Sequence, residues 1–123
     1  MARYRALRTG LLGLHKVLLD AERRRYTRTH GPVEGTQQIL RLVMTDPWFA
    51  WLRPIAELIV QVDERLSTDV PITPSDVRAL SDHARGLLQT DLGGPTFRDT
   101  YQRTLQEVPD VVVAHAQVIK LLD

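Results

Sequence analysis

The sequence predicts an all-α protein: a single compact bundle of four to six antiparallel helices formed by residues 1–123. Three observations support this fold class. Apolar residues recur at steps of three and four, as on one face of a helix. The alternation of apolar and polar residues that is typical of a half-buried strand is not found over any extended stretch. The loops are short, which favours antiparallel neighbours. A chain of 123 residues suits one domain. It can bury roughly two-thirds of its unfolded surface.

The segment 46–66, with the sequence DPWFAWLRPIAELIVQVDERL, has the longest amphipathic pattern, and we expect it to form the central helix. Asp46 before Pro47 predicts its start, because Asp accepts hydrogen bonds from free N–H groups and Pro loses no bond there. Its apolar side chains share one helical face: Trp48, Leu52, Ile55, Ile59, Val62 and Leu66.

Pro54 leaves two alternatives for this segment, because proline cannot donate a backbone hydrogen bond and disfavours the α conformation of the preceding residue. The helix either kinks at Pro54, or a short turn at 47–52 precedes a straight helix at 54–66. We favour the kink, because the apolar pattern keeps its phase through the proline.

The remaining helices follow from the same periodicity and from their end signals. The first ends where Gly31 suits a left-handed cap and Pro32 cannot continue the helix. Thr73 before Pro74, with an acid at 76, is typical of a helix start. We expect these helices at 2–29, about 36–45, from 74 to the break at 91–95, about 96–107 and about 110–122.

Composition indicates the compartment. The chain has no cysteine, which excludes disulfides and thiolate metal sites and is compatible with a reducing compartment. His15 and Lys16 interrupt the apolar run near the N-terminus, so we expect no signal peptide and no membrane association. The sequence therefore favours a cytoplasmic protein of bacterial type.

Four segments carry a resemblance to known proteins: LHKVLLDAE at 14–22, HGPV at 30–33, DPWFAWLRPIAELIVQVDE at 46–64 and VPDVVVAHA at 108–116. Together they resemble a group of small bacterial helical proteins that have no assigned activity. The resemblance covers most of the chain and implies a compact helical fold in the bacterial cytoplasm. It implies no cofactor and no catalytic residue.

Charge is distributed unevenly along a chain whose net charge is +1. Residues 1–31 carry eight Arg and Lys and two acids, whereas the remainder carries eight basic and thirteen acidic residues. The favoured interpretation is that the first helix docks against acidic neighbours. The alternative is a nucleic-acid accessory protein that uses Arg23, Arg24, Arg25 and Tyr26. Consecutive arginines on a helix do not form one stripe, which argues against this alternative.

Two histidines and two acids are candidates for a metal or small-ligand site: His15, Glu22, Asp63 and His115. Side chains of these types on facing helices can converge on a metal ion. However, the Glu-x-x-His pairs of dicarboxylate sites are absent from the sequence. The favoured interpretation is that His15 and Asp63 are half-buried polar groups satisfied by hydrogen bonds.

No catalytic motif is recognisable, so we expect no enzyme and no cofactor. The run at 48–51 cannot place all of its side chains against one core, so Phe49 or Trp51 should point sideways or outward. We therefore predict a non-enzymatic, self-associating interaction domain. Its predicted interaction surface combines the aromatic run with the basic end of the first helix: Trp48, Phe49, Trp51, Arg23, Arg24, Arg25 and Tyr26. A homodimer or another protein is the expected partner.

Overall fold

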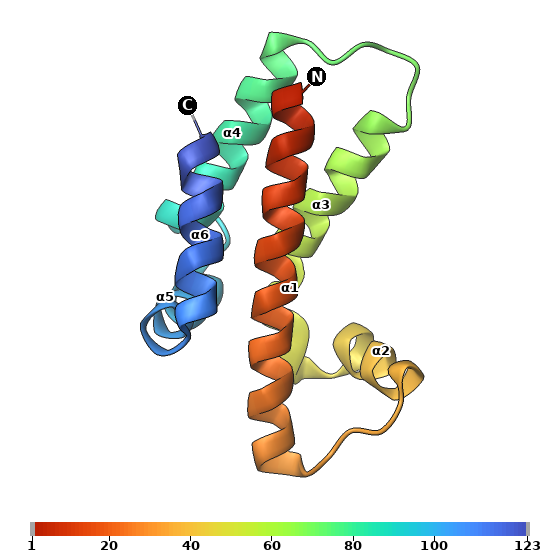
Figure 1. Ribbon diagram of the computed structural model, residues 1–123, viewed down its shortest axis with the longest axis vertical. Helices are drawn as coiled ribbons and strands as arrows, with labels where there is room; N and C mark the ends of the chain where they lie inside the picture. The colour runs from red at the N-terminus through yellow and green to blue at the C-terminus, as the bar shows by residue number, and fades with distance from the viewer. Residues whose placement is uncertain (1, 123) are drawn as a thin grey trace.

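The computed structural model describes residues 2–122 and confirms the all-α class (Figure 1). Within this range the chain forms six α-helices and one 3-10 helix, and no strand. The elements are α1 (Ala2–His30), α2 (Thr36–Thr45), η1 (Pro47–Leu52), α3 (Arg53–Leu66), α4 (Pro74–Gln89), α5 (Pro95–Glu107) and α6 (Pro109–Leu121).

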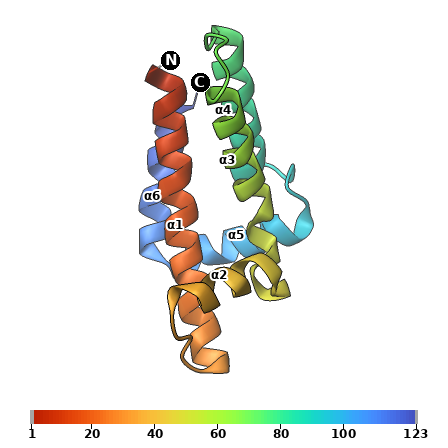
Figure 2. The ribbon, with the colours of Figure 1, turned by 90° about the vertical axis from the view of Figure 1, so that its right-hand side faces the viewer.

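Four of the helices form an up-and-down bundle. In Figure 1, α1 and α4 run downward, whereas α3 and α6 run upward, so both termini lie at the same end. Each of these helices contacts antiparallel neighbours: α1 contacts α3 and α6, and α4 contacts the same two helices. Figure 2 shows that α5 lies across the other end of the bundle, while α2 packs on η1 beside it.

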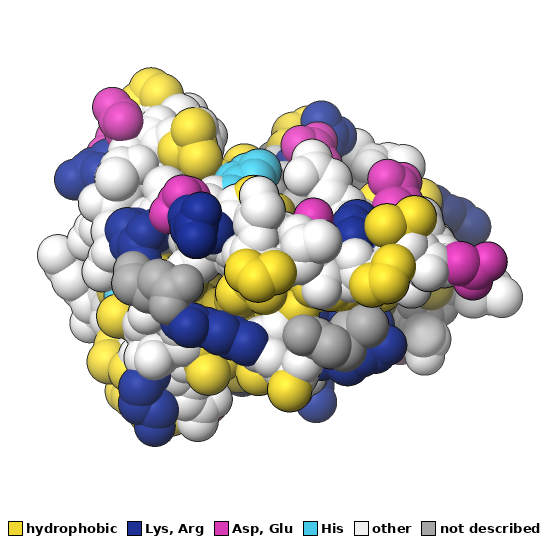
Figure 3. Space-filling view, turned by 90° about the horizontal axis from the view of Figure 1, so that it is seen from above, with side chains coloured by type: hydrophobic (Ala, Val, Ile, Leu, Met, Phe, Trp, Pro, Cys, Tyr) yellow, Lys and Arg dark blue, Asp and Glu magenta, His cyan; other side chains and the backbone are white. Residues whose placement is uncertain are grey.

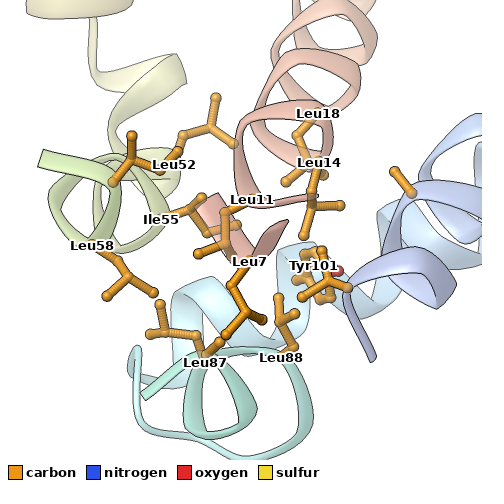
Figure 4. Close-up of a cluster of buried hydrophobic side chains, with 14 of the residues drawn as sticks. Leu7, Leu11, Leu14, Leu18, Leu52, Ile55, Leu58, Leu87, Leu88 and Tyr101 are labelled. Atoms are coloured by element: carbon orange, nitrogen blue, oxygen red, sulfur yellow. The ribbon is translucent and has the colours of Figure 1, made fainter. Parts of the chain in front are cut away.

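The core is built around α1, not around the segment 46–66 to which the sequence analysis gave the central position. Four leucines of α1, Leu7, Leu11, Leu14 and Leu18, are fully buried and lie between the other helices in Figure 4. α1 is also the longest helix, and it contacts α3, α4, α6 and η1. The segment 46–66 instead supplies one wall of the bundle.

Pro54 follows the second of the two alternatives. A 3-10 helix, η1, covers the residues of the expected turn, and α3 begins at Arg53 with Pro54 in its first turn. A proline there loses no intrahelical bond, because the first N–H groups of a helix have no partner within it. The predicted start at Asp46 is confirmed, since its Oδ1 accepts a hydrogen bond from the N–H of Trp48 at 2.9 Å.

The other predicted helix ends are also confirmed. Gly31 adopts φ 87°, the left-handed conformation expected after α1. At the start of α4, the N–H of Asp76 donates to Thr73 Oγ1 at 3.1 Å, and the N–H of Thr73 donates to Asp76 Oδ2 at 2.8 Å. None of the helices within 2–122 combines the length and the apolar character needed to cross a bilayer.

Candidate functional site

A pocket of about 320 Å³ lies where α1, η1 and α5 meet. Glu22 and Arg25 of α1 line it, together with Trp48 and Trp51 of η1. The pocket therefore joins residues that the sequence analysis treated separately, because Glu22 belonged to the ligand hypothesis and the other three to the interaction surface.

The α1 side of the pocket is an ion pair whose carboxylate is buried. Glu22 is only 1% exposed, and its Oε1 accepts a hydrogen bond from Nη1 of Arg25 at 2.8 Å. The two residues are three positions apart, which places them on the same side of the helix. Arg25 also lies over the Trp48 ring, with Cζ 5.5 Å from the ring centroid, where a cation is attracted to the aromatic face. Glu22 and Trp48 thus both hold the Arg25 guanidinium.

The η1 side carries both tryptophans of the chain. A 3-10 helix has three residues per turn, so side chains three positions apart point the same way. This geometry directs Trp48 and Trp51 together toward the pocket. It also explains why Phe49, at a different angle on the helix, is 2% exposed and belongs to the core. Phe49 is therefore removed from the predicted interaction surface, which corrects that part of the prediction.

The indole nitrogens are the unusual feature of this site. Nε1 of Trp48 and Nε1 of Trp51 are the buried side-chain polar atoms within residues 2–122 that have no hydrogen-bond partner. Leaving such a donor unpaired away from water costs about 1–3 kcal/mol. Native proteins pair almost all of these groups, so two exceptions on residues that line the same pocket require an explanation.

The α5 side was not predicted from the sequence. Thr96, Thr100 and Arg103 line the pocket, and their spacing of four and three places them on one helical face. A neighbouring face of α5 carries Phe97 and Tyr101, which are buried in the core. A polar face on an amphipathic helix is ordinarily just solvated, so the sequence held no signal that this one borders a pocket.

The remaining residues of the predicted interaction surface lie outside the pocket. The Tyr26 ring stacks on His30 with centroids 4.1 Å apart and meets the Trp48 ring edge-on at 5.6 Å. Arg23 and Arg24 are exposed, and neither forms an ion pair with any residue from 2 to 122. Arg25 thus faces a different environment from its two neighbours.

The basic residues of the first helix are partly paired within the fold, as the favoured interpretation expected. Arg8 of α1 forms an ion pair with Asp63 of α3, and Arg3 donates to the backbone oxygen of Leu121 at 2.8 Å. Figure 3 views the end of the bundle that holds the termini, and there basic and acidic side chains are interspersed. This face does not present a continuous basic patch.

The four metal-ligand candidates do not converge. Glu22 binds Arg25, Asp63 pairs with Arg8, and His115 Nδ1 lies 2.6 Å from the Tyr101 hydroxyl. His15 is half-buried, and burial lowers its pKa. Within the described part of the chain, no group of three or more His, Asp or Glu side chains is placed to hold a metal ion.

The chain was compared with protein families, curated proteins and solved structures. No protein family, no curated protein and no solved structure matches this chain. The resemblance to small bacterial helical proteins therefore stays an expectation, and the functional argument rests on the geometry of the pocket.

Proposed function

We propose that this protein is a non-enzymatic binding protein that holds a small organic molecule in the pocket between α1, η1 and α5. The observation that carries the proposal is the pair of unpaired indole N–H groups, because both tryptophans line this one pocket. A bound molecule with acceptor atoms would offset the cost of these buried donors once the rings adjust toward it. Ligand pockets typically combine such apolar walls with a few polar groups.

The lining favours binding over catalysis. Its one carboxylate, Glu22, already accepts a hydrogen bond from Arg25, and no histidine lines the pocket among the described residues. The hydroxyls of Thr96 and Thr100 therefore have no base beside them that could activate a nucleophile. The lack of cysteine in the chain suits the reducing bacterial cytoplasm, where we propose that the protein works.

The experiment is a small-molecule screen read by two-dimensional NMR of the ¹⁵N-labelled protein. The chain has two tryptophans, and both line the pocket, so the two indole N–H signals are sensitive to binding at this site. We expect compounds that bind here to shift both signals downfield as the donors gain acceptors. Compounds that raise the melting temperature but leave both indole signals in place would place the binding elsewhere and contradict the proposal.

A variant with a filled pocket tests the assignment of the site, and a second substitution on the same helix is its matched control. Replacing Thr100 with Leu adds apolar volume to the lining and should abolish the indole shifts. Replacing Gln102 with Leu adds the same side chain to an exposed position of the same helix, outside the pocket, and should leave the shifts unchanged. Equal effects of the two substitutions would contradict the assignment of the site.

Self-association remains a second proposal, and the exposed face of α2 favours it. This amphipathic helix has no fully buried residue, and its Leu40 and Met44 side chains are 55% and 72% exposed. They are four residues apart and so lie on one face. We propose that a second copy of the chain covers this face, since a two-fold axis would pair the two α2 helices with each other.

Sedimentation at several protein concentrations tests the dimer. We expect concentration-dependent association that is lost on Met44→Glu, because the dimer would bury the new charge. Val60→Glu is the control, since Val60 is 54% exposed on α3, away from α2. A protein that stays monomeric at high micromolar concentration rejects the dimer.

A further inference from the structure

The chemistry of the pocket lining also indicates which class of molecule it binds. We propose that the ligand is a small planar organic anion, and that the guanidinium of Arg103 binds its charged group. This inference rests on the proposed function. The argument has three parts: the charge left over in the lining, the hydrogen-bonding groups left uncommitted, and the arrangement of both around the aromatic walls.

The charges of the lining leave one cation without a partner. Two guanidinium groups and one carboxylate line the pocket. Glu22 pairs with Arg25, and the two charges offset each other. Arg103 forms no ion pair or hydrogen bond through its side chain with any residue from 2 to 122, so its charge is the surplus. A pocket with one surplus positive charge favours a ligand with one negative charge.

The uncommitted polar groups have the same preference. The indole N–H groups of Trp48 and Trp51 can only donate, and they have no acceptor. The hydroxyls of Thr96 and Thr100 donate to no described group and can each supply a further hydrogen bond. A hydroxyl can donate or accept, whereas the indole N–H groups and the Arg103 guanidinium only donate. The excess of donors therefore comes from these groups, and it selects a ligand rich in oxygen acceptors, such as a carboxylate or a phosphate.

The arrangement separates the anion from the rest of the ligand. Thr96, Thr100 and Arg103 lie along one face of α5, whereas the tryptophans project from η1. An anionic group on the α5 side would therefore place the body of the ligand against the indole rings. Flat apolar rings suit such walls, because aromatic pairs gain from stacked and edge-on contact.

The experiment compares probes that share a ring and differ in charge. Benzoate and phenyl phosphate are the anions, benzamide is the neutral analogue and benzylamine is the cation. Each is titrated into the ¹⁵N-labelled protein while the two indole signals are followed. We expect the anions to shift both signals with saturation, and benzamide and benzylamine to bind at least tenfold more weakly, as a charge-assisted hydrogen bond predicts.

Two arginines of α5 provide the matched variants. Arg103→Gln should weaken benzoate binding about tenfold or more, because it removes the surplus charge and leaves the fold intact at an exposed position. Arg98→Gln changes an equally exposed arginine that does not line the pocket, and benzoate affinity should not change. Circular dichroism of both variants verifies that they are folded.

The outcomes separate the two proposals. Benzamide binding as tightly as benzoate, or an Arg103→Gln variant with unchanged affinity, overturns the anionic ligand while the pocket remains a binding site. If none of the four probes shifts either indole signal, the anionic ligand is rejected and the proposed function loses its support as well. Saturable shifts by the anions, reduced by Arg103→Gln and not by Arg98→Gln, establish the inference.

Discussion

The hydroxyl of Tyr101 lies 2.6 Å from Nδ1 of His115, and this bond ties α5 to α6 beside the core. Burial raises the pKa of Tyr101, so the tyrosine stays protonated and donates its O–H. Burial also lowers the pKa of His115, so the ring stays neutral and Nδ1 accepts. The sequence analysis named His115 as a candidate metal ligand but did not favour a metal site, and the structure pairs it with Tyr101.

The first prediction concerns pH. Because burial lowers the pKa of His115 and of His15, the unfolded chain binds protons more readily than the folded one near the ordinary value of 6.5. The contribution of these histidines to the free energy of unfolding is therefore fully present above that value. The free energy of unfolding should fall as the pH drops below it. Urea unfolding at about pH 7.5 and about pH 5.5 measures the difference. A His115 pKa above 6.5 in an NMR titration would contradict the prediction.

Removing the hydroxyl gives the second prediction. Tyr101→Phe should lower the free energy of unfolding by about 1 kcal/mol and raise the pKa of His115, because the lost donor had favoured the neutral ring. Urea unfolding and NMR titration measure the two effects. Gln102→Ala is the control, because it changes an exposed residue of α5 and leaves the bond intact. Phe97→Tyr is not a suitable control. An unchanged His115 titration in Tyr101→Phe would refute the role of the hydroxyl.

The third prediction concerns the start of α4. Hydrogen bonds from Thr73 and Arg65 lower the pKa of Asp76 to about 2. Since the folded pKa lies below the ordinary value of 3.8, this stabilisation is present above about pH 4 and is lost as pH falls toward about pH 2. Asp76→Asn should flatten the acid limb of a stability–pH curve in that range. An identical acid limb in the variant and the parent would count against the prediction.

Two glycines of α1 give the fourth prediction. A Cβ at Gly13 meets nothing within 4 Å, so Gly13→Ala should stabilise the protein by about 1 kcal/mol through helix propensity. A Cβ at Gly10 would lie 3.3 Å from Cγ2 of Val118, so Gly10→Ala should gain less or destabilise. Thermal unfolding of the two variants side by side compares them. Equal stabilisation by both would show that α6 does not pack closely on Gly10.

The buried ion pair gives the fifth prediction, an asymmetry between its partners. Glu22 is 1% exposed, whereas the Arg25 side chain is 31% exposed. Arg25→Met leaves the buried Glu22 carboxylate without its partner and should lower the free energy of unfolding by about 3 kcal/mol or more. Glu22→Gln leaves a cation that reaches water and should cost about 1 kcal/mol. Urea unfolding of both variants measures the two costs, and equal values would contradict the burial that the structure gives to Glu22.

Much of the secondary structure could be predicted because its causes are local. Thr73 caps α4 and Gly31 ends α1 through interactions with residues a few positions away, so the sequence contains the whole signal. At Pro54 the local rules allowed two outcomes. The structure has a 3-10 helix that contacts α1 and α5, and contacts with such distant segments lie outside the local rules.

The candidate site was only partly predictable. Trp48, Trp51 and Arg25 were identified as surplus aromatic and charged surface, and Glu22 as a polar group near an apolar face. Which of them meet could not be predicted, because α1 and η1 are joined by a loop and a helix whose path no local rule fixes. The α5 side of the pocket had no sequence signal at all.

Hydrophobic spacing and capping act within a few residues, so they predicted that this chain is helical, where most helices begin and end, and which apolar face most helices turn to the core. The tertiary structure was needed to place α1 at the centre, to bury Phe49 and to bring His115 to Tyr101. It also decided that two indole N–H groups are left without acceptors beside a buried ion pair. These outcomes depend on elements far apart in the sequence packing together, and packing distances are set by the whole core.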